Sequence, residues 1–335
     1  LAVGDRVRFI EADVAPADES PSTIGSTWTN GQRVSITVVH PGLFTTVQDL
    51  GRRGHRGSGV PLSGAADAVA MRLANLLVGN QPDAAGLECT LLGPTLRFER
   101  DAIVAVVGGE FPGLPSGRAV SLAAGTEITF GHATAGCRGC LAVAGGIDVE
   151  PVLGSRSTLV AAGIGGFAGR ALAAGDRLAV GEPTGSPVRV DLRGISVAGA
   201  RRPCVVRVIP GEHAEACGSI WSRTFRASSR SDRMGLRLDG EPVVAAGDFG
   251  GMASVAVFPG TVQLPPDGRP IVLLADAQTV GGYPVAGQVI AADLPLAAQL
   301  RPGDEVRMEP VGIDEAVAAV RRREAMLADL AGQRR

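Results

Sequence analysis

The sequence predicts a mainly β fold with a few helices, and three observations support this prediction. Short aliphatic and β-branched runs recur along the 335 residues, for example at 34–39, 103–107, 204–209, 254–258 and 271–274. The 47 glycines and 22 prolines separate these runs, which is typical of short strands joined by tight turns. A pattern of glycine, polar residue and alternating aliphatic residues occurs four times, at 4–9, 125–130, 175–180 and 303–308.

Internal repetition predicts two β units in tandem. A strand followed by Pro-Gly occurs as VVHPG (38–42) and again as VIPG (208–211). GPTLRFERDAIVAVVGG (93–109) is similar to GTVQLPPDGRPIVLLAD (260–276), and each unit ends in one glycine-led strand pattern. Three internal similarities that occur in the same order in both parts of the chain favour a repeated unit over chance. We therefore expect a first domain at 34–190 and a second at 191–315, meeting near 181–203.

The first 33 residues differ from the rest of the chain. Residues 13–33 are rich in Pro, Ser, Thr and acids and have little to bury, so they are predicted to be a linker. Residues 1–12 carry the strand pattern GDRVRF, which we interpret as the tail of a preceding domain.

Two helices are expected. Residues 65–78 are apolar at helical spacing, with Ser63 as a candidate N-terminal cap and Gly79 after the last turn. The second helix is expected at 314–330, beginning at Asp314. Its apolar face would consist of Val317, Val320, Leu327 and Leu330.

Charge and hydropathy exclude several classes of function. The net charge of −2 gives no electrostatic case for nucleic acid or a membrane surface. No apolar run reaches the ~18 residues of a membrane span, and no signal peptide is visible, so a cytoplasmic location is expected.

The five cysteines also suit a reducing compartment. Cys137 and Cys140 form a single CxxC with His132 nearby, whereas a structural zinc site needs four ligands. Two buried thiols in a strand are therefore expected rather than a metal site.

The chain contains no lysine, because all 32 basic residues are arginine. A P-loop, a Schiff base and biotin attachment each need a lysine amine. Any chemistry with ATP or biotin therefore has to use arginine or another polypeptide.

Tyr283 is the only tyrosine of the chain and lies on a Gly-Gly-Tyr-Pro turn. Gly281 and Gly282 allow a close approach or an unusual φ, and Pro284 stiffens the exit. The turn could line a functional cleft together with parts of the first half, or Tyr283 could cap the second core. Both interpretations stay open at this point.

Several polar, glycine-rich motifs follow one another in a specific order. They are PGLFTTVQDLGRRGHRGSGVPLSGAAD (41–67), ANLLVGN (74–80), LECTLLGP (87–94), LAVAGGIDV (141–149), LGSRST (153–158), GIGGFAGR (163–170), AGDRL (174–178), SDRMGLRL (231–238), GTVQLPPDGRPIVLLADAQTVGGYP (260–284) and RPGDEV (301–306). This ordered set resembles the allophanate hydrolase subunit 2 family, to which the C subunits of 5-oxoprolinase belong. It is also similar to part of the carboxyltransferase domain of urea carboxylase and to the antagonist of a sporulation-kinase inhibitor. The N-terminal GDRVRF resembles the end of allophanate hydrolase subunit 1.

The resemblance implies two tandem cyclophilin-like β-barrels. It also implies a complex with a partner that resembles allophanate hydrolase subunit 1 and the B subunit of 5-oxoprolinase, possibly fused upstream. The expected activity is that of an ATP-dependent amidohydrolase, which opens 5-oxo-L-proline to glutamate with a further lactam-utilisation subunit. The chain would be inactive alone, and ATP would be shared with, or supplied through, the partner subunits.

Two alternatives stay open beside this activity. One is the carboxyltransferase part of a biotin-dependent urea or amide carboxylase, with biotin on another chain. The other is a non-catalytic antagonist of a kinase inhibitor.

Opening a lactam through phosphorylation of its oxygen needs three kinds of group. An arginine would hold the substrate carboxylate, donors would stabilise developing oxyanions, and a carboxylate would position or deprotonate water. The candidate catalytic residues are Asp276, Gln278, Tyr283 and Asp49. The candidate substrate-binding residues are Gln48, Arg52, Asn75, Asn80, Arg156, Ser231, Asp232, Arg233, Gln263 and Thr279. No metal ligand is expected.

Overall fold

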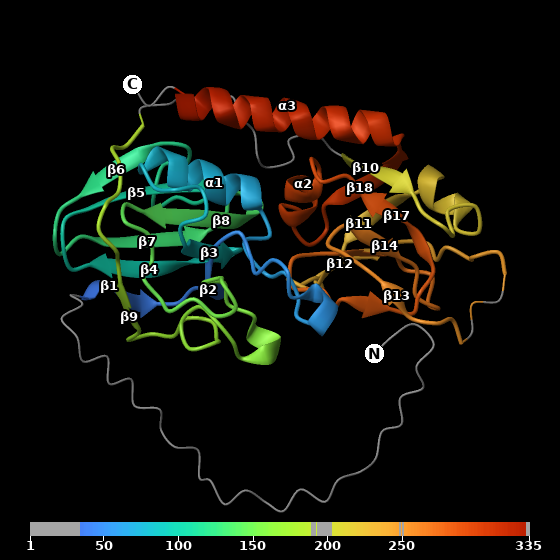
Figure 1. The fold of residues 1–335 in the computed structure, drawn as a ribbon, viewed down its shortest axis with the longest axis horizontal. Helices are drawn as coiled ribbons and strands as arrows, with labels where there is room; N and C mark the ends of the chain where they lie inside the picture. The colour runs from blue at the N-terminus through green and yellow to red at the C-terminus, as the bar shows by residue number, and fades with distance from the viewer. Residues whose placement is uncertain (1–33, 189–191, 193–202, 248, 250, 333–335) are drawn as a thin grey trace, which may run out of the picture. The chain divides into compact units, whose positions relative to one another are not determined.

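The computed structural model describes residues 34–188, 192, 203–247, 249 and 251–332. The expected tail and linker at 1–33, and much of the expected junction at 181–203, lie outside these residues. The predicted mainly β fold class is confirmed, with a strand-rich first half (34–188) and second half (203–310) and three α-helices (Figure 1).

The first half contains two β-sheets. The four-stranded sheet has the order β7-β4-β1-β9 and the five-stranded sheet has the order β2-β3-β8-β5-β6. Their strands are β1 (Val34–His40), β2 (Phe44–Gln48), β3 (Gly86–Thr90), β4 (Leu92–Phe98), β5 (Ala102–Glu110), β6 (Ala119–Leu122), β7 (Glu127–His132), β8 (Ala135–Val143) and β9 (Arg177–Ala179), with short 3-10 turns at Arg56–Ser58 and Val160–Ala162.

The first core lies between these two sheets, and alternation along β5 shows how the sequence builds it. Val104 and Val106 face the core between the sheets. Ala105 and Val107 point to the opposite face, where they pack against helix α1 (Ala68–Leu77). The five-stranded sheet is therefore covered on both faces (Figure 1), which explains its nearly continuous apolar runs.

The second half closes into a barrel of seven strands in the order β10-β17-β14-β15-β12-β11-β18. A separate core, to which Val208, Phe225, Val262 and Val306 belong, fills it. The elements are β10 (Cys204–Pro210), β11 (Thr224–Ala227), β12 (Gly235–Asp239), β14 (Thr261–Gln263), β15 (Ile271–Leu273), β17 (Val285–Val289) and β18 (Glu305–Pro310), with a 3-10 helix at Gly218–Ser222 and helix α2 (Leu294–Ala298). A two-stranded ribbon of β13 (Val255–Ala256) and β16 (Val280–Gly281) lies beside the barrel.

The two halves use the repeated motifs in similar places and close differently. Both strand–Pro-Gly motifs follow the first strand of their half, β1 and β10, and the glycine-led patterns lead into β9 and β18. In the second half β14 pairs directly with β15. The corresponding β4 and β5 belong to different sheets, so hydrogen bonds do not close the first half in the same way.

Helix α1 begins later than the sequence predicts. Asp67, not Ser63, caps it, because Asp67 Oδ1 accepts a hydrogen bond from Ala70 N at 2.8 Å. Ser63 instead adopts a left-handed φ of 55° and turns its hydroxyl away from the helix. Gly79 follows the helix with a φ of 82°, as predicted.

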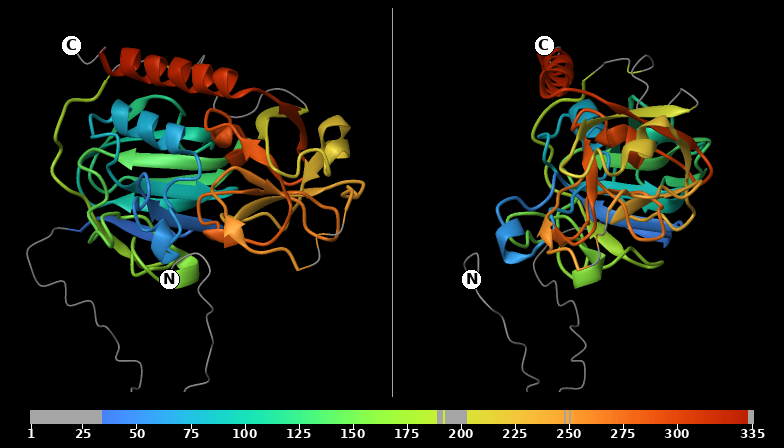
Figure 2. Two further views of the ribbon diagram at one scale, coloured as in Figure 1. Left: turned by 45° about the vertical axis from the view of Figure 1, so that its right-hand side comes forward. Right: turned by 90° about the vertical axis from the view of Figure 1, so that its right-hand side faces the viewer.

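Helix α3 (Ile313–Gly332) forms where the C-terminal helix is predicted, and its buried face agrees with the predicted one at Leu327 and Leu330 but differs in the first turns. Ala316, Ala319, Leu327 and Leu330 are buried, whereas Val317 is 42% exposed. Ala316 and Ala319 pack against Ile290 of the second half. The first turns of α3 therefore lie over the second half (Figure 2). Among the described residues, no helix is long and apolar enough to cross a membrane.

Candidate functional site

The Gly-Gly-Tyr-Pro turn borders a cavity of about 510 Å³, which we call the Tyr283 pocket. Its polar lining residues are Arg230, Arg237, Gln263, Asp267, Arg269, Gln278 and Tyr283. All of its lining residues come from the second half, so the first half does not contribute to this pocket. Several of them belong to β12, β14 and β15, which are neighbouring strands of one barrel.

Gly281 serves a close approach rather than an unusual φ, whereas a Cβ at residue 282 would meet no atom closer than 3.4 Å. A Cβ at residue 281 would lie 2.5 Å from Nε2 of Gln263, which is buried beneath the turn. Gln278 Nε2 donates to Gln263 Oε1 at 3.4 Å, so one amide positions the other. Tyr283 is 43% exposed and therefore does not cap the core. Its hydroxyl and the Gln278 amide are available to a ligand in the pocket.

The charge of the Tyr283 pocket favours an anionic ligand. Arg230 and Arg269 both pair with Asp239, at 3.3 and 3.6 Å. Within the described part of the chain, the Arg237 guanidinium has no hydrogen bond or ion pair, although its backbone is held by Ser231. Arg237 is thus a free, planar donor pair suited to a carboxylate.

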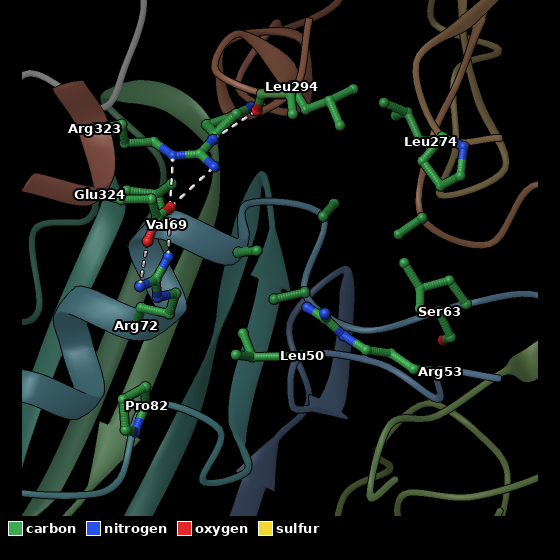
Figure 3. Close-up of a pocket in the computed structure, with 18 residues that line it drawn as sticks. Leu50, Arg53, Ser63, Val69, Arg72, Pro82, Leu274, Leu294, Arg323 and Glu324 are labelled. Atoms are coloured by element: carbon green, nitrogen blue, oxygen red, sulfur yellow. Dashed lines mark hydrogen bonds and ion pairs between the residues drawn. The ribbon is translucent and has the colours of Figure 1, made fainter. Parts of the chain in front are cut away.

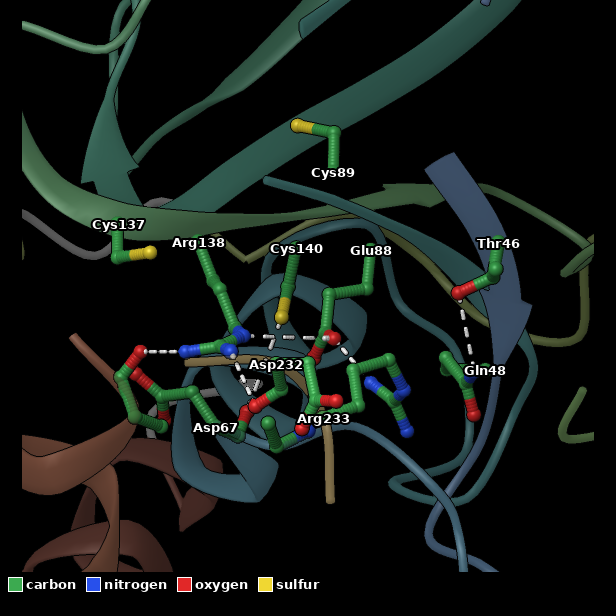
Figure 4. Close-up of polar contacts among 12 residues, drawn as sticks. Thr46, Gln48, Asp67, Glu88, Cys89, Cys137, Arg138, Cys140, Asp232 and Arg233 are labelled. Carbon is green, nitrogen blue, oxygen red and sulfur yellow. Dashed lines mark hydrogen bonds and ion pairs between the residues drawn. The ribbon is translucent and has the colours of Figure 1, made fainter. Parts of the chain in front are cut away.

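A buried ion-pair network joins the two halves around Arg233 (Figure 4). Arg233 Nε donates to Asp276 Oδ2 at 2.8 Å and Nη2 donates to Asp276 Oδ1 at 3.0 Å. Arg233 Nη1 donates to Glu88 of the first half, and Nη2 also reaches the Gly64 carbonyl oxygen at 2.5 Å. Ser63 Oγ lies 2.9 Å from Asp276 Oδ1. Asp276 is therefore committed to Arg233 and Ser63, and not free to activate water.

Arg138 and Gln299 extend this network. Gln299 Oε1 accepts hydrogen bonds from the backbone N–H groups of Cys137 and Arg138, at 2.9 and 3.0 Å. Its Nε2 donates to Asp67 Oδ2 at 2.8 Å and to the Arg138 carbonyl oxygen at 2.9 Å. The Arg138 side chain bonds to the Ala298 carbonyl oxygen (Figure 4). One glutamine after α2 therefore satisfies four groups of the first half.

Burial changes the proton affinity of two groups in the network. The pKa of Asp67 is raised to about 6 because burial disfavours its charged form, while the bonds from Gln299 and Ala70 oppose this shift. Burial alone would lower the pKa of Arg233, but the carboxylates of Glu88 and Asp276 raise it above its ordinary value. Arg233 is permanently charged and structural in this arrangement.

Asp49 organises a loop rather than a reaction site. Its Oδ1 accepts hydrogen bonds from Gly51 N and Ser155 Oγ, both at 2.7 Å, and its Oδ2 accepts one from Arg156 N at 2.6 Å. Arg52 is fully buried and donates to the Ser157 carbonyl oxygen. Burial lowers the pKa of Arg52, and Asp49 and Asp276 oppose that shift.

The other candidates of the first half hold backbone in place. Gln48 is fully buried and bonds to Thr46 and to the Thr158 carbonyl oxygen, at 3.0 and 3.1 Å. Asn80 Nδ2 donates to Asn75 Oδ1 at 3.0 Å and to the Val143 carbonyl oxygen at 2.8 Å. The Asn75–Asn80 pair therefore fixes the turn after α1.

The remaining candidates also have local contacts. Arg156 lies at the surface and donates from Nε to the Val149 carbonyl oxygen at 2.7 Å. Asp232 Oδ1 accepts the N–H groups of Met234 and Gly235 at 2.8 and 3.0 Å, which forms a turn. Thr279 lies beside Gln278, and its carbonyl oxygen accepts Val257 N at 3.0 Å.

The predicted site residues thus separate into distinct places. Gln263, Gln278 and Tyr283 meet in one pocket, whereas Asp276 and Arg233 belong to the buried network. Glu88, Arg138 and Gln299 were missed as network members, although a charged residue within the apolar run LECTLL is itself a signal of a buried partner. Nothing local marks Gln299, since its partners lie in the other half of the chain.

The cysteine thiols are structural, and the Cys140 thiol donates to the Asp67 carbonyl oxygen at 3.7 Å. All five are buried and free, and Cys137 and Cys140 lie in β8, as the sequence predicts. Burial raises the pKa of the Cys140 thiol well above its ordinary value, so it stays neutral. No group of three or more His, Cys, Asp or Glu residues in the described ranges is placed to hold a metal ion.

A second cavity, which we call the Ser63 pocket, has a volume of about 670 Å³ and lies between the first half, the second half and α3 (Figure 3). Its walls are largely apolar, with Leu50, Val69, Leu274 and Leu294 among them. Ser63 lies at the side nearest to the buried Arg233 network.

Comparison with known proteins defines the class. Residues 58–310 match the family of the carboxyltransferase domain, subdomains A and B. The chain belongs to this carboxyltransferase-domain family. It is 39% identical over 295 residues to the C subunit of 5-oxoprolinase from Escherichia coli, which covers 85% of the chain and 94% of that protein.

Larger proteins contain a similar region. The chain is 30% identical over 317 residues to urea amidolyase of Lachancea kluyveri, covering 83% of the chain and 17% of that protein. The crystal structure of Kluyveromyces lactis urea carboxylase superposes with a TM-score of 0.84 at 28% identity, covering 90% of the chain and 29% of that protein. The chain therefore spans less than a third of these multidomain relatives.

Proposed function

We propose that the chain is a subunit of an ATP-dependent amidohydrolase that opens 5-oxo-L-proline to glutamate. The proposal rests mainly on its 39% identity to the C subunit of Escherichia coli 5-oxoprolinase over nearly the whole of that protein. A subunit-1-like protein and a lactam-utilisation protein would be its partners, and ATP would act at a site that the subunits share.

The Tyr283 pocket supports this proposal through its chemistry. Arg237 offers a free guanidinium for a substrate carboxylate. Gln278 and Tyr283 offer an amide and a hydroxyl for a cyclic amide, and Gln263 fixes the orientation of Gln278. The pocket volume of about 510 Å³ is sufficient for a small amide.

The same pocket favours a reaction that needs the partner subunits over one that this chain catalyses alone. Asp276 and Asp49, the expected water-activating carboxylates, are engaged in structural hydrogen bonds. Asp267 is the carboxylate that lines the pocket. The purified chain alone is therefore expected to release no phosphate from ATP in the presence of 5-oxoproline.

The decisive experiment is ATP-coupled conversion of 5-oxoproline to glutamate by the chain assembled with its two partners. Arg237→Gln should raise KM for 5-oxoproline at least tenfold, because a charge-assisted hydrogen bond is lost. Tyr283→Phe should lower kcat by roughly tenfold to a hundredfold if its hydroxyl stabilises developing charge. Arg226→Gln is the matched control, since Arg226 is an exposed arginine of the same barrel outside the pocket. Wild-type kinetics in both pocket variants would remove the pocket from the reaction.

A second candidate function is the carboxyltransferase part of a biotin-dependent carboxylase. The TM-score of 0.84 with urea carboxylase over 90% of the chain favours it. Biotin would have to be carried outside these 335 residues, because they contain no lysine. Avidin inhibition of urea-dependent ATP consumption by the assembled complex would support this candidate, whereas avidin-insensitive turnover of 5-oxoproline would refute it.

A further inference from the structure

We propose that the Ser63 pocket binds an organic phosphate, that is, a phosphorylated ligand with an apolar or aromatic body. The pocket is separate from the Tyr283 pocket, and no lining residue is shared between them. The inference therefore goes beyond the proposed function, and only the choice of ATP as one probe rests on it.

The pocket carries a positive charge that its own carboxylate does not balance. Arg53, Arg72 and Arg323 line it, together with Glu324 (Figure 3). Arg72 forms a bidentate pair with Glu324, with nitrogen–oxygen distances of 3.0 and 2.8 Å. This pairing lowers the pKa of Glu324, so the carboxylate stays charged. Three guanidinium groups and one carboxylate leave two positive charges.

Arg53 is the cation that is available to a ligand. In the part of the chain that the structure describes, its guanidinium has no hydrogen bond or ion pair, and it is exposed at the cavity wall. Arg323 is already engaged, since its Nη1 donates to the Ala291 carbonyl oxygen at 2.6 Å, and its Nε and Nη2 donate to Glu324 Oε1 at 3.3 and 3.2 Å. A ligand at Arg53 would therefore displace no existing partner.

Charge and shape together select the ligand class. A phosphate monoester carries about −1.5 to −2 charges at neutral pH, which balances the pocket better than a single carboxylate. Inorganic phosphate would leave most of the 670 Å³ and the leucine, valine and proline walls unused. Such a volume is typical of sites for whole small molecules. The pocket thus fits a phosphate attached to an apolar body, as in a nucleotide.

The rigidity of the pocket wall supports a preformed site. The Ser63 backbone N–H donates to the Ala275 carbonyl oxygen at 2.9 Å, which ties the first half to the second across the cavity. Ser63 holds its left-handed φ of 55° while its side chain bonds to the buried network. Strained, over-determined backbone of this kind occurs preferentially at binding sites.

The test is calorimetric titration of the purified chain, without partners, with ATP, phenyl phosphate and inorganic phosphate. ATP and phenyl phosphate should bind at least tenfold more tightly than inorganic phosphate, and Arg53→Gln should weaken both at least tenfold. Tighter binding of ATP than of phenyl phosphate would identify a nucleotide site, and the reverse order would identify another organic phosphate. Arg322→Gln, on the same helix as Arg323 but outside the cavity, should bind like the wild type.

A second variant tests occupancy without changing charge. Ala68 lines the cavity at the start of α1 and is exposed, so Ala68→Leu should narrow the pocket without harming the helix. It should weaken binding of both organic phosphates. Unchanged affinity in Arg53→Gln and Ala68→Leu, preference for inorganic phosphate, or no binding at all would overturn the proposal. Because no 5-oxoproline or partner is present, these outcomes are independent of whether the proposed activity exists.

Discussion

Asp67 has two roles. Its side chain caps α1, and it accepts a hydrogen bond from Gln299 of the second half. Its folded-state pKa of about 6 lies above the ordinary value of 3.8. The folded state therefore binds more protons at Asp67 than the unfolded state between these values, and the contribution of Asp67 to stability falls as the pH rises from 3.8 to about 6.

Asp67→Asn should remove this pH dependence while keeping a good helix cap. The difference in free energy of unfolding between the wild type and the variant should change by about 2 kcal/mol from pH 4 to pH 7, in the direction that favours the variant at high pH. Urea unfolding across this range measures the change. Asp329→Asn, an exposed carboxylate on α3, is the control and should leave the profile as it is. A constant difference at all pH values would contradict a raised pKa.

At the scale of elements, α3 is the helix whose attachment the sequence predicts least well. Leu327 and Leu330 belong to the core that α1 forms against β5 and β8, so the end of the chain completes the first half. The bidentate Arg72–Glu324 pair lies between the same two helices. The helix therefore spans both halves, with Ala316 and Ala319 on the second half and Leu327 and Leu330 on the first.

Leu327→Ala should lower the free energy of unfolding by about 2–4 kcal/mol, because it removes buried methyl groups and leaves a cavity. Val317→Ala on the exposed side of the same helix should change it by about 0.5 kcal/mol or less. Chemical denaturation of both variants compares them directly. An equal decrease in the free energy of unfolding in both variants would contradict the burial of the Leu327 face of α3.

For the whole molecule, the contact between the two halves includes the buried guanidinium of Arg233. Its guanidinium comes from the second half and binds Glu88 of the first half and Asp276 of the second. Removing the arginine lowers the free energy of unfolding by more than the intact ion pair contributes to it. The reason is that the carboxylates of Glu88 and Asp276 would remain buried without a positive partner.

Arg233→Met should therefore lower the free energy of unfolding by about 3–5 kcal/mol. It should also loosen the coupling of the two cores, so that unfolding followed at the two halves no longer coincides. Circular dichroism together with fluorescence of Trp221, which packs on the second core, can follow this. Arg230→Met at an exposed ion pair is the control. Wild-type stability in Arg233→Met would show that the network contributes little to the join.

The class of fold can be predicted from the sequence, because the signals that indicate it are local. Glycine and proline positions, β-branched runs and the strand–Pro-Gly repeat depend on neighbouring residues alone, and they correctly predicted strands such as β1, β5 and β10. The ordered motifs determined the family. The close approach at Gly281, which lies over Gln263, also agrees with the backbone-entropy cost of a glycine at this turn.

Only the tertiary structure decided which polar residues work together. Asp276 and Tyr283 are seven positions apart, yet Asp276 points to Arg233 inside the protein while Tyr283 borders a surface pocket. Gln299 meets Asp67 and Arg138, more than 150 positions away along the chain. A buried polar group must find a partner wherever the fold brings one within about 3 Å, and sequence distance carries no information about that. The same reason explains why no local pattern predicts the Ser63 pocket, whose walls come from both halves and from the last helix.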